Sequence, residues 1–166
     1  MRVVSEPFGG GALTRAVLDG AAPKDWFMAR PRGAEEWRSH AETVQASFPD
    51  ARWLETLRPA ISASGIAEER LERVAAARGV VVTTGQQPGL FGGAGYTWLK
   101  ALSAIALAER IEQATGIPSV AVFWAATDDA DFAEASFTTV ALGAECRRIS
   151  IDRAGDDGLE IGRAHV

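Results

Sequence analysis

Two groups of residues have the types and spacing that chemistry requires, and the first follows a short β-branched run, Val80 to Thr84. This group is the stretch GQQPGLFGGAG, residues 85–95, which combines five glycines with the carboxamides of Gln86 and Gln87. A strand, a glycine-rich loop and a helix in this order present backbone N–H groups and a helix N-terminus to an anionic ligand. The sequence therefore predicts the floor of a binding site here, and a flexible turn is the plain alternative.

The second group is acidic, since Asp128, Asp129 and Asp131 follow the apolar run IPSVAVFWAA, residues 117–126. Carboxylates this close together repel one another unless a cation or hydrogen-bond donors offset their charge. A metal-bound nucleotide, a substrate ammonium group or backbone N–H groups would each do so. A solvated acidic turn explains these residues equally well in isolation, and the glycine-rich loop shifts the balance toward a site.

The elements that must position both groups form one βαβ unit. Val80–Val82 has the composition of a strand, and Tyr96–Gln113 has helical periodicity and closes at Gly116. Ile117–Ala126 is a near-continuous apolar run, which is typical of a buried parallel strand. Because ligands bind outside the carboxyl ends of parallel strands, the two groups are expected to meet at one edge of the sheet.

A helical region precedes this unit, and shorter strands follow it. After Pro31, Trp37, Ala41, Val44 and Phe48 fall on one face of a predicted helix. Further helices are predicted at residues 13–18, 51–57 and 66–78, and Gly79 is expected to end the last of them. Further strands are predicted at residues 137–142 and 147–151.

Composition narrows the range of functions. The chain has 166 residues, 47% of them hydrophobic, and a net charge of −5 with dispersed acidic residues, which argues against a nucleic-acid partner. One cysteine, Cys146, excludes an intrachain disulfide, and together with two histidines it cannot build a zinc cluster, so no metal is predicted. The chain shows neither the apolar core of a signal peptide nor a stretch long enough to span a bilayer, so a cytoplasmic protein without a membrane partner is predicted.

Other features carry weaker predictions. The glycine-rich loop lacks the Lys-Ser/Thr pair of a Walker loop and does not match G-x-G-x-x-G. Lys100 is expected either to point back toward the site or to face solvent, which is the commoner fate of a lysine. The tryptophans, among them Trp53 and Trp124, are expected to pack in the core. Cys146 is expected to be a half-buried structural thiol.

The two groups together carry a specific likeness. TGQQPGLFGGAGYTWLKALSAIALA, residues 84–108, resembles the TGQQ-x-GLF-x-GP-x-YT-x-x-KA motif of the bacillithiol-biosynthesis cysteine-adding enzymes, the BshC family. IPSVAVFWAATDDADFAEA, residues 117–135, is similar to the PVFW-I/V-A-x-EDHDF-x-E block that follows in that family. The likeness is clear over residues 57–137 and looser in the preceding helices.

The resemblance implies an α/β fold with a Rossmann-like, nucleotidylyltransferase-like parallel sheet, here incomplete and preceded by the helical region. It implies a cysteine ligase that joins cysteine to the amino group of glucosaminyl-malate in the last step of bacillithiol biosynthesis. ATP-dependent adenylation of cysteine is expected by likeness to the same superfamily, and full-length relatives are expected to be homodimers.

The resemblance also assigns site residues. Asp128, Asp129 and Asp131 are the expected catalytic residues, where a carboxylate would orient an amine. The residues expected to bind substrate or nucleotide are Thr84, Gly85, Gln86, Gln87, Gly92, Gly93, Tyr96 and Lys100. In this assignment the loop amides would hold an anionic group.

Three positions depart from the family pattern. Ala130 stands where the family has His, Asp128 stands where it has Glu, and Gly93–Ala94 replaces its Gly-Pro pair. Alanine cannot transfer a proton, so the activity is altered or lost here if that His is essential. Another nucleotide-dependent ligase or nucleotidyltransferase, or a non-catalytic fragment, is therefore the alternative function.

The predicted division of the chain has three parts. Residues 1–78 form a loop and helical region that packs on the core, and residues 79–159 form the first βαβ part of the Rossmann-like core. Residues 160–166 are expected to be a non-native tail, because Ile161–Val166 reverse-translates to a sequence that resembles a sequencing adapter. Family members are several times longer, so this stretch is expected to be inactive by itself.

Overall fold

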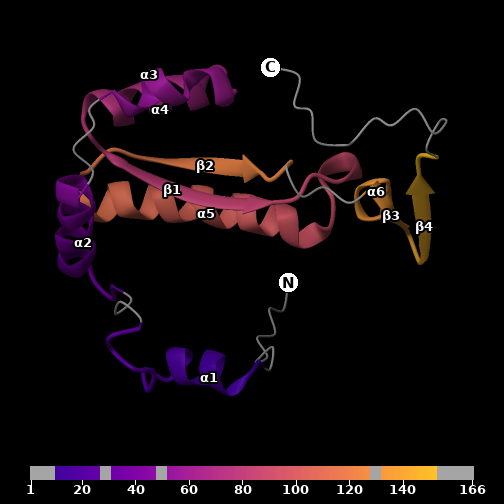
Figure 1. Ribbon diagram of the computed structural model, residues 1–166, viewed down its shortest axis with the longest axis horizontal. Coiled ribbons are helices and arrows are strands. Elements are labelled where there is room, and N and C mark those ends of the chain that lie inside the picture. Colours follow the sequence, from indigo (N-terminus) through magenta and orange to yellow (C-terminus); the bar gives the residue numbers. More distant parts are fainter. Residues whose placement is uncertain (1–9, 27–30, 48–51, 128–131, 153–166) are drawn as a thin grey trace. The chain divides into compact units, whose positions relative to one another are not determined.

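A computed structural model describes residues 10–26, 31–47, 52–127 and 132–152 (Figure 1). The chain divides into two compact units, residues 1–33 and 34–166. Within the described part of the first unit, α1 (Ala12–Leu18) confirms the helix predicted over residues 13–18. Its Leu18 side chain is exposed.

The second unit opens with the predicted helices. These are α2 (Ala34–Ser47), α3 (Trp53–Leu57) with the short 3₁₀ turn η1 (Arg58–Ala60), and α4 (Ile66–Ala76). On the predicted apolar face of α2, Ala41 is buried and Trp37 is half-buried, whereas Val44 is exposed and Phe48 lies outside the described residues. The helices predicted before the βαβ unit are therefore confirmed. The apolar face of α2 is less continuous than expected.

The end of α4 differs from the prediction in an instructive way. The helix stops at Ala76, and Arg78, not Gly79, adopts the left-handed conformation, with φ at 52°. The N–H of Gly79 donates to the Val74 carbonyl at 2.7 Å, and the N–H of Arg78 donates to the Ala75 carbonyl at 3.2 Å. This pair of bonds is the Schellman arrangement, which satisfies carbonyls that the helix end leaves without a partner. Gly79 therefore does not end the helix by a left-handed conformation, and is instead in close contact with Pro118.

The centre of the unit is the predicted βαβ unit. β1 (Val80–Gln86) and β2 (Ser119–Ala125) pair in parallel, from Val80 opposite Ser119 to Gln86 opposite Ala125, and α5 (Gly95–Thr115) connects them. Gly116 ends α5 with φ at 74°, as predicted. The prediction that Gly85 and Gln86 start the loop is wrong, because both residues pair with β2 and extend the strand.

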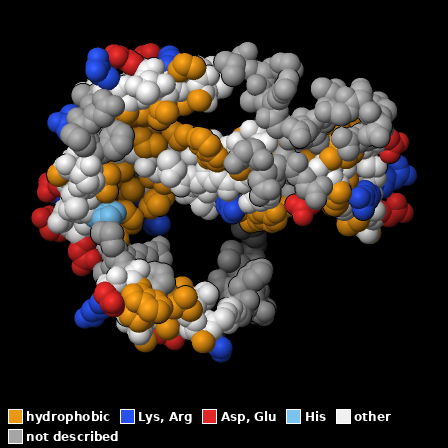
Figure 2. Space-filling view, in the orientation of Figure 1, with side chains coloured by type: hydrophobic (Ala, Val, Ile, Leu, Met, Phe, Trp, Pro, Cys, Tyr) orange, Lys and Arg blue, Asp and Glu red, His pale blue; other side chains and the backbone are white. Residues whose placement is uncertain are grey.

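Helices cover both faces of this pair (Figure 1). On one face, Leu71 and Val74 of α4 form a buried cluster with Val120, and Val81 and Val122 pack against it. On the other face, α5 lies along both strands and buries Ala104, Ala108 and Ile111. Figure 2 shows apolar side chains gathered over the strands on the side of α3 and α4. The described residues thus form a helix–sheet–helix sandwich, an incomplete α/β fold.

Burial decreases along β2, which corrects two predictions. Ser119 and Val120 are buried, but Phe123 is 39% exposed and Trp124 is 66% exposed. The strand is therefore not buried throughout, and Trp124 does not pack in the core. The buried cluster of α4 lies against the first half of the strand, so its carboxyl half extends past that cover. Trp53, by contrast, does pack against the core cluster.

A small hairpin follows the βαβ unit. After the short helix α6 (Phe132–Ala135), β3 (Phe137–Leu142) and β4 (Glu145–Ser150) pair antiparallel around Gly143, where φ is 66°. The strand predicted at residues 137–142 is confirmed, and its partner begins two residues earlier than the predicted 147. Cys146 on β4 is exposed, so the expectation of a half-buried thiol is wrong.

Two glycines let β1 and β2 approach closely at both ends. A Cβ at Gly79 would overlap the Pro118 carbonyl oxygen. A Cβ at Gly85 would lie 2.7 Å from the Trp124 carbonyl oxygen and 3.0 Å from the Trp124 Cβ. Both distances are shorter than packed carbon and oxygen atoms tolerate, so a side chain at either position would push the strands apart. The close spacing of the parallel pair therefore depends on glycine at these two positions.

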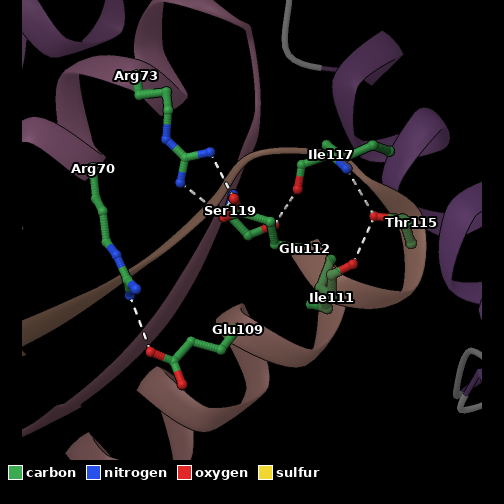
Figure 3. Close-up of polar contacts among 8 residues, drawn as sticks. All are labelled: Arg70, Arg73, Glu109, Ile111, Glu112, Thr115, Ile117 and Ser119. Carbon is green, nitrogen blue, oxygen red and sulfur yellow. Dashed lines mark hydrogen bonds and ion pairs between the residues drawn. The ribbon is translucent and has the colours of Figure 1, made fainter.

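A polar cluster joins α4 to α5 beside the first residue of β2 (Figure 3). Arg73 of α4 donates two hydrogen bonds to the carboxylate of Glu112 in α5, at 2.6 and 3.0 Å. The same carboxylate accepts the Ser119 N–H at 3.1 Å. Arg70 pairs with Glu109 one turn earlier in each helix, at 3.1 Å. Helix, helix and strand are therefore held together by a single carboxylate.

The hydrogen bond from Arg73 is the main reason that the pKa of Glu112 lies below the usual value of a glutamate. The Ser119 N–H and the charges of Arg73 and Arg70 lower this pKa further, and partial burial opposes them. A group whose pKa is lowered by folding contributes stability above the pKa of the unfolded chain. That contribution is lost as the pH falls through the lower pKa of the folded state.

We expect Glu112→Gln to lower the free energy of unfolding by about 0.5–1 kcal/mol at neutral pH, because the pair is partly exposed and solvent screens it. The difference between the variant and the unaltered chain shrinks in acid, where Glu112 is protonated in both states. Urea unfolding at a series of pH values measures both effects. Glu109→Gln, which breaks the more exposed Arg70 pair, is the matched control and is expected to have the smaller effect. Equal effects of the two substitutions would contradict a special role of Glu112 in joining α4, α5 and β2; we call this Glu112-centred cluster the polar clamp.

We expect Gly85→Ala to destabilise the fold by about 1–3 kcal/mol, because the added methyl group meets the Trp124 backbone and overpacking has this cost. Gly95→Ala is the matched control, since a Cβ at Gly95 meets no atom within 4 Å and its φ is not in the left-handed range. The control is expected to stay within about 0.5 kcal/mol of the unaltered chain. Similar unfolding midpoints for the two variants would show that the contact with the Trp124 backbone does not exclude a side chain at position 85.

Candidate functional site

The carboxyl ends of β1 and β2 lie side by side, as the sequence predicts. Gln86 is opposite Ala125, and the N–H of Ala126 donates to the Gln86 carbonyl at 3.1 Å. This contact carries the pairing one residue beyond β2 and brings Thr127 to the same edge. Asp128, Asp129, Ala130 and Asp131 lie outside the described residues, so the predicted position of the carboxylates opposite the loop stays a prediction.

A pocket of about 410 Å³ lies between β1 and α5 and contains three of the predicted binding residues, Thr84, Tyr96 and Lys100. Leu99 and Ser103 also line it, and neither was predicted. Both residues could have been predicted from the sequence, because positions 96, 99, 100 and 103 share one face of a helix at spacings of three and four. The first two turns of α5 therefore form one wall of the pocket.

Lys100 points back to the strand end. Its ammonium nitrogen Nζ donates to the Gln86 Oε1 at 2.7 Å and to the Gly85 carbonyl at 3.3 Å. The same nitrogen lies 5.7 Å from the centre of the Tyr96 ring, within the range of a cation–π contact. Of the two alternatives expected for Lys100, its ammonium group therefore takes the one that points back toward the strand end, although the side chain as a whole stays exposed. A fixed positive charge results at the end of β1.

Gln86 and Gln87 are in contact at this end. The Gln86 Nε2 donates to the Gln87 Oε1 at 3.5 Å, and both residues are half-buried. The strand, the lysine of α5 and the two carboxamides therefore form one connected group. Lys100 of this group also lines the 410 Å³ pocket, so the group borders that pocket.

The glycines of the loop have conformational roles. Gly92 and Gly93 have φ of 87° and 77°, in the left-handed region that disfavours other residues. Their N–H groups donate to the carbonyls of Gly89 and Leu90 in the short turn η2 (Leu90–Gly92). A Cβ at Gly92 would also lie 2.9 Å from the Trp98 ring. The sequence pattern identified these glycines, but it gave no sign of the contact with Trp98.

A second, wider groove of about 1130 Å³ reaches the strand ends from the other face of the sheet. Its walls are mainly apolar, and include Trp53, Leu57, Ile61, Val122, Trp124 and Thr127. The exposed indole of Trp124 therefore lies at the end of a groove instead of in the core. The polar group and the apolar groove therefore reach the carboxyl ends of the strands from opposite faces of the sheet.

The described residues offer neither a cluster of metal ligands nor a membrane-spanning helix. No three His, Cys, Asp or Glu side chains come together there as metal ligands would. Within the same part of the chain, each helix is too short or too polar to cross a bilayer.

Comparison with known proteins gives a consistent result. The family model for the N-terminal Rossmann-like domain of BshC, of bacillithiol biosynthesis, matches residues 14–166. A relative from Heliobacterium modesticaldum is 39% identical over 128 residues, which cover 76% of this chain and 22% of that protein. A relative from Symbiobacterium thermophilum is 34% identical over 159 residues, which cover 89% of this chain and 29% of that protein. Each is named provisionally as a cysteine ligase, BshC.

These matches confirm both the resemblance and the Rossmann-like fold predicted from the motifs. The chain spans less than a third of the length of either relative. Because the family model covers almost the whole chain, including the parallel strand pair and its glycine-rich loop, the chain belongs to the BshC family and carries its N-terminal Rossmann-like domain.

Proposed function

We propose that the gene product containing this chain is a cysteine ligase of bacillithiol biosynthesis that joins cysteine to the amino group of glucosaminyl-malate. The observation that carries the proposal is the connected group at the end of β1, where Lys100 contacts Gly85 and Gln86 inside a family match over residues 14–166. The relatives' provisional name of cysteine ligase supports the same activity.

The reaction needs an activated carboxyl group, because a free carboxylate does not react with an amine at neutral pH. In the proposed mechanism the cysteine carboxylate attacks the α-phosphorus of ATP and releases pyrophosphate. The sugar amine then attacks the carbonyl carbon of the adenylate, AMP leaves with the bonding electrons, and the nitrogen loses a proton. ATP is part of the proposal and is supported by the nucleotidylyltransferase-like character that the resemblance implies.

The residues of this chain suit the binding half of that reaction. The donors of Gln86 and Gln87, with Lys100 bonded to Gln86 beside them, would stabilise an anionic or carbonyl oxygen at the strand end. Asp128, Asp129 or Asp131 would orient the amine as a hydrogen-bond acceptor. Trp124 and the apolar groove behind it would hold the less polar part of a substrate.

The setting of the enzyme is part of the same proposal. A cytoplasmic location suits a chain with one cysteine, which is exposed and would stay reduced there. Homodimerisation of the gene product is proposed by likeness to the family.

A second candidate is favoured by one residue. Ala130 stands at the position of the family His, so a related nucleotide-dependent ligase or nucleotidyltransferase with a different acceptor is the alternative.

The direct test incubates the full gene product with ATP, L-cysteine and glucosaminyl-malate and follows the amide product by mass spectrometry. We expect a product heavier than glucosaminyl-malate by one cysteinyl group, dependent on cysteine and on ATP. L-Serine in place of cysteine is the control for thiol recognition. AMP release without the cysteinyl product would favour the alternative ligase, and absence of nucleotide binding would favour a non-catalytic protein.

We expect Ala130→His in the full gene product to raise the rate of cysteine transfer by roughly tenfold or more, because a positioned imidazole adds general acid–base catalysis. Gln113→His is the control, since Gln113 is exposed on α5 and the change adds the same imidazole away from the carboxyl ends of β1 and β2. Equal rates for the Ala130→His variant and the unaltered enzyme would exclude a catalytic role for this position.

A further inference from the structure

The carboxamide of Gln86 has two orientations of nearly equal shape, related by exchange of its oxygen and its NH₂ group. In one orientation the NH₂ group faces Gln87, and in the other the oxygen does. The two present opposite hydrogen-bonding character to any ligand at the end of β1. A neighbouring residue that is compatible with only one orientation therefore decides whether Gln86 presents a hydrogen-bond donor or an acceptor to a ligand.

Lys100 is such a neighbour. An ammonium group has three donors and no acceptor, so only the oxygen of Gln86 can face it. The observed 2.7 Å contact joins Lys100 Nζ to Gln86 Oε1. The NH₂ group then points the other way, toward the Gln87 Oε1 at 3.5 Å. A hydrogen bond with a charged donor is about twice as strong as a neutral one, so the preference is substantial.

The position of the ammonium group is itself fixed from three sides. It bonds the Gly85 carbonyl at 3.3 Å as well as Gln86, and these acceptors come from consecutive residues of β1. The Tyr96 ring, one helical turn before Lys100, lies beside it at 5.7 Å. The strand and the first turns of α5 thus hold the lysine at the strand end instead of letting it extend into solvent.

We infer that Lys100 is a positioning residue, which holds the Gln86 carboxamide so that its NH₂ group serves as a donor on the site floor. The ligand group that meets this donor is an acceptor oxygen, of a carboxylate, a carbonyl or a phosphoryl group. The role in ligation rests on the proposed function, whereas the orientation of Gln86 does not. Direct binding of an anion by Lys100 is the competing role, and the experiments separate the two.

The composition of the chain allows a clean spectroscopic test. It contains no asparagine and four glutamines, Gln45, Gln86, Gln87 and Gln113, so residues 1–166 contribute four side-chain NH₂ pairs to a ¹H–¹⁵N spectrum of the full gene product. Gln86→Leu assigns the Gln86 pair by its loss. The Lys100→Met variant is expected to move the Gln86 and Gln87 pairs and to leave Gln45 and Gln113 in place. Lys24→Met is the matched control, because Lys24 is the other lysine of the chain and is exposed in the other unit.

The result that overturns the inference is a Gln86 pair that is unchanged in Lys100→Met, or one that moves equally in Lys24→Met. General unfolding would move all four pairs together, and in that case Lys100→Arg decides the matter. Arginine keeps a donor at this place, so it is expected to retain the Gln86 signals of the unaltered chain; loss of those signals in a folded Lys100→Arg variant also contradicts the inference.

A double-mutant cycle in the full gene product tests the role in ligation. Lys100→Met is expected to raise the KM for one substrate about three- to tenfold, the effect of one lost hydrogen bond. In a Gln86→Leu background the same change is expected to have no further effect, because the lysine acts through Gln86. A further loss in that background would show that Lys100 binds the anion itself. If the unaltered protein forms no cysteinyl product, the proposed function fails, and the spectrum still decides the orientation of Gln86.

Discussion

The close approach of β1 and β2 is the constraint on which the rest of the structure depends. At Gly79 the carbonyl of Pro118, just before β2, occupies the space that a side chain would need, and at Gly85 the carbonyl of Trp124 in β2 does so. These contacts lie near opposite ends of the parallel pair, so the close spacing of the strands depends on glycine at both ends. The residue before Gly79 is Arg78, which ends α4 in the left-handed conformation. A residue other than glycine therefore adopts this less favourable conformation directly before the strand pair.

The site inherits its geometry from the same pair. Gly85 brings the Trp124 backbone against β1, and the next residue, Gln86, then lies opposite Ala125 at the edge where the strands end. α5 starts from the glycine-rich loop and returns Lys100 to this edge. At the other end of the sheet, Glu112 joins α4, α5 and Ser119. The polar clamp and the polar site therefore sit at opposite ends of one small sandwich, with the apolar cluster between them.

Local signals in the sequence were sufficient to predict which helices and strands form. They were insufficient to predict the contacts and the burial of individual side chains. Glycine at position 116 and the β-branched run at Val80 predicted the end of α5 and the start of β1, because both effects act within a few residues. The extension of β1 through Gln86 depends on pairing with residues far along the chain. The exposure of Trp124 depends on how far α4 covers the strand. The direction of Lys100 depends on acceptors in β1, which a helical pattern does not reveal.

The proposed ligase activity needs a place where substrates bind, and the connected polar group at the end of β1 offers one. We propose that substrates bind where Gln86, Gln87 and Lys100 meet. A crystal structure of the full gene product with L-cysteine and a non-hydrolysable ATP analogue tests it most directly. We expect a ligand oxygen within hydrogen-bond distance of the Gln86 side chain. Ligands that occupy another part of the protein and contact neither Gln86 nor Gln87 would contradict it.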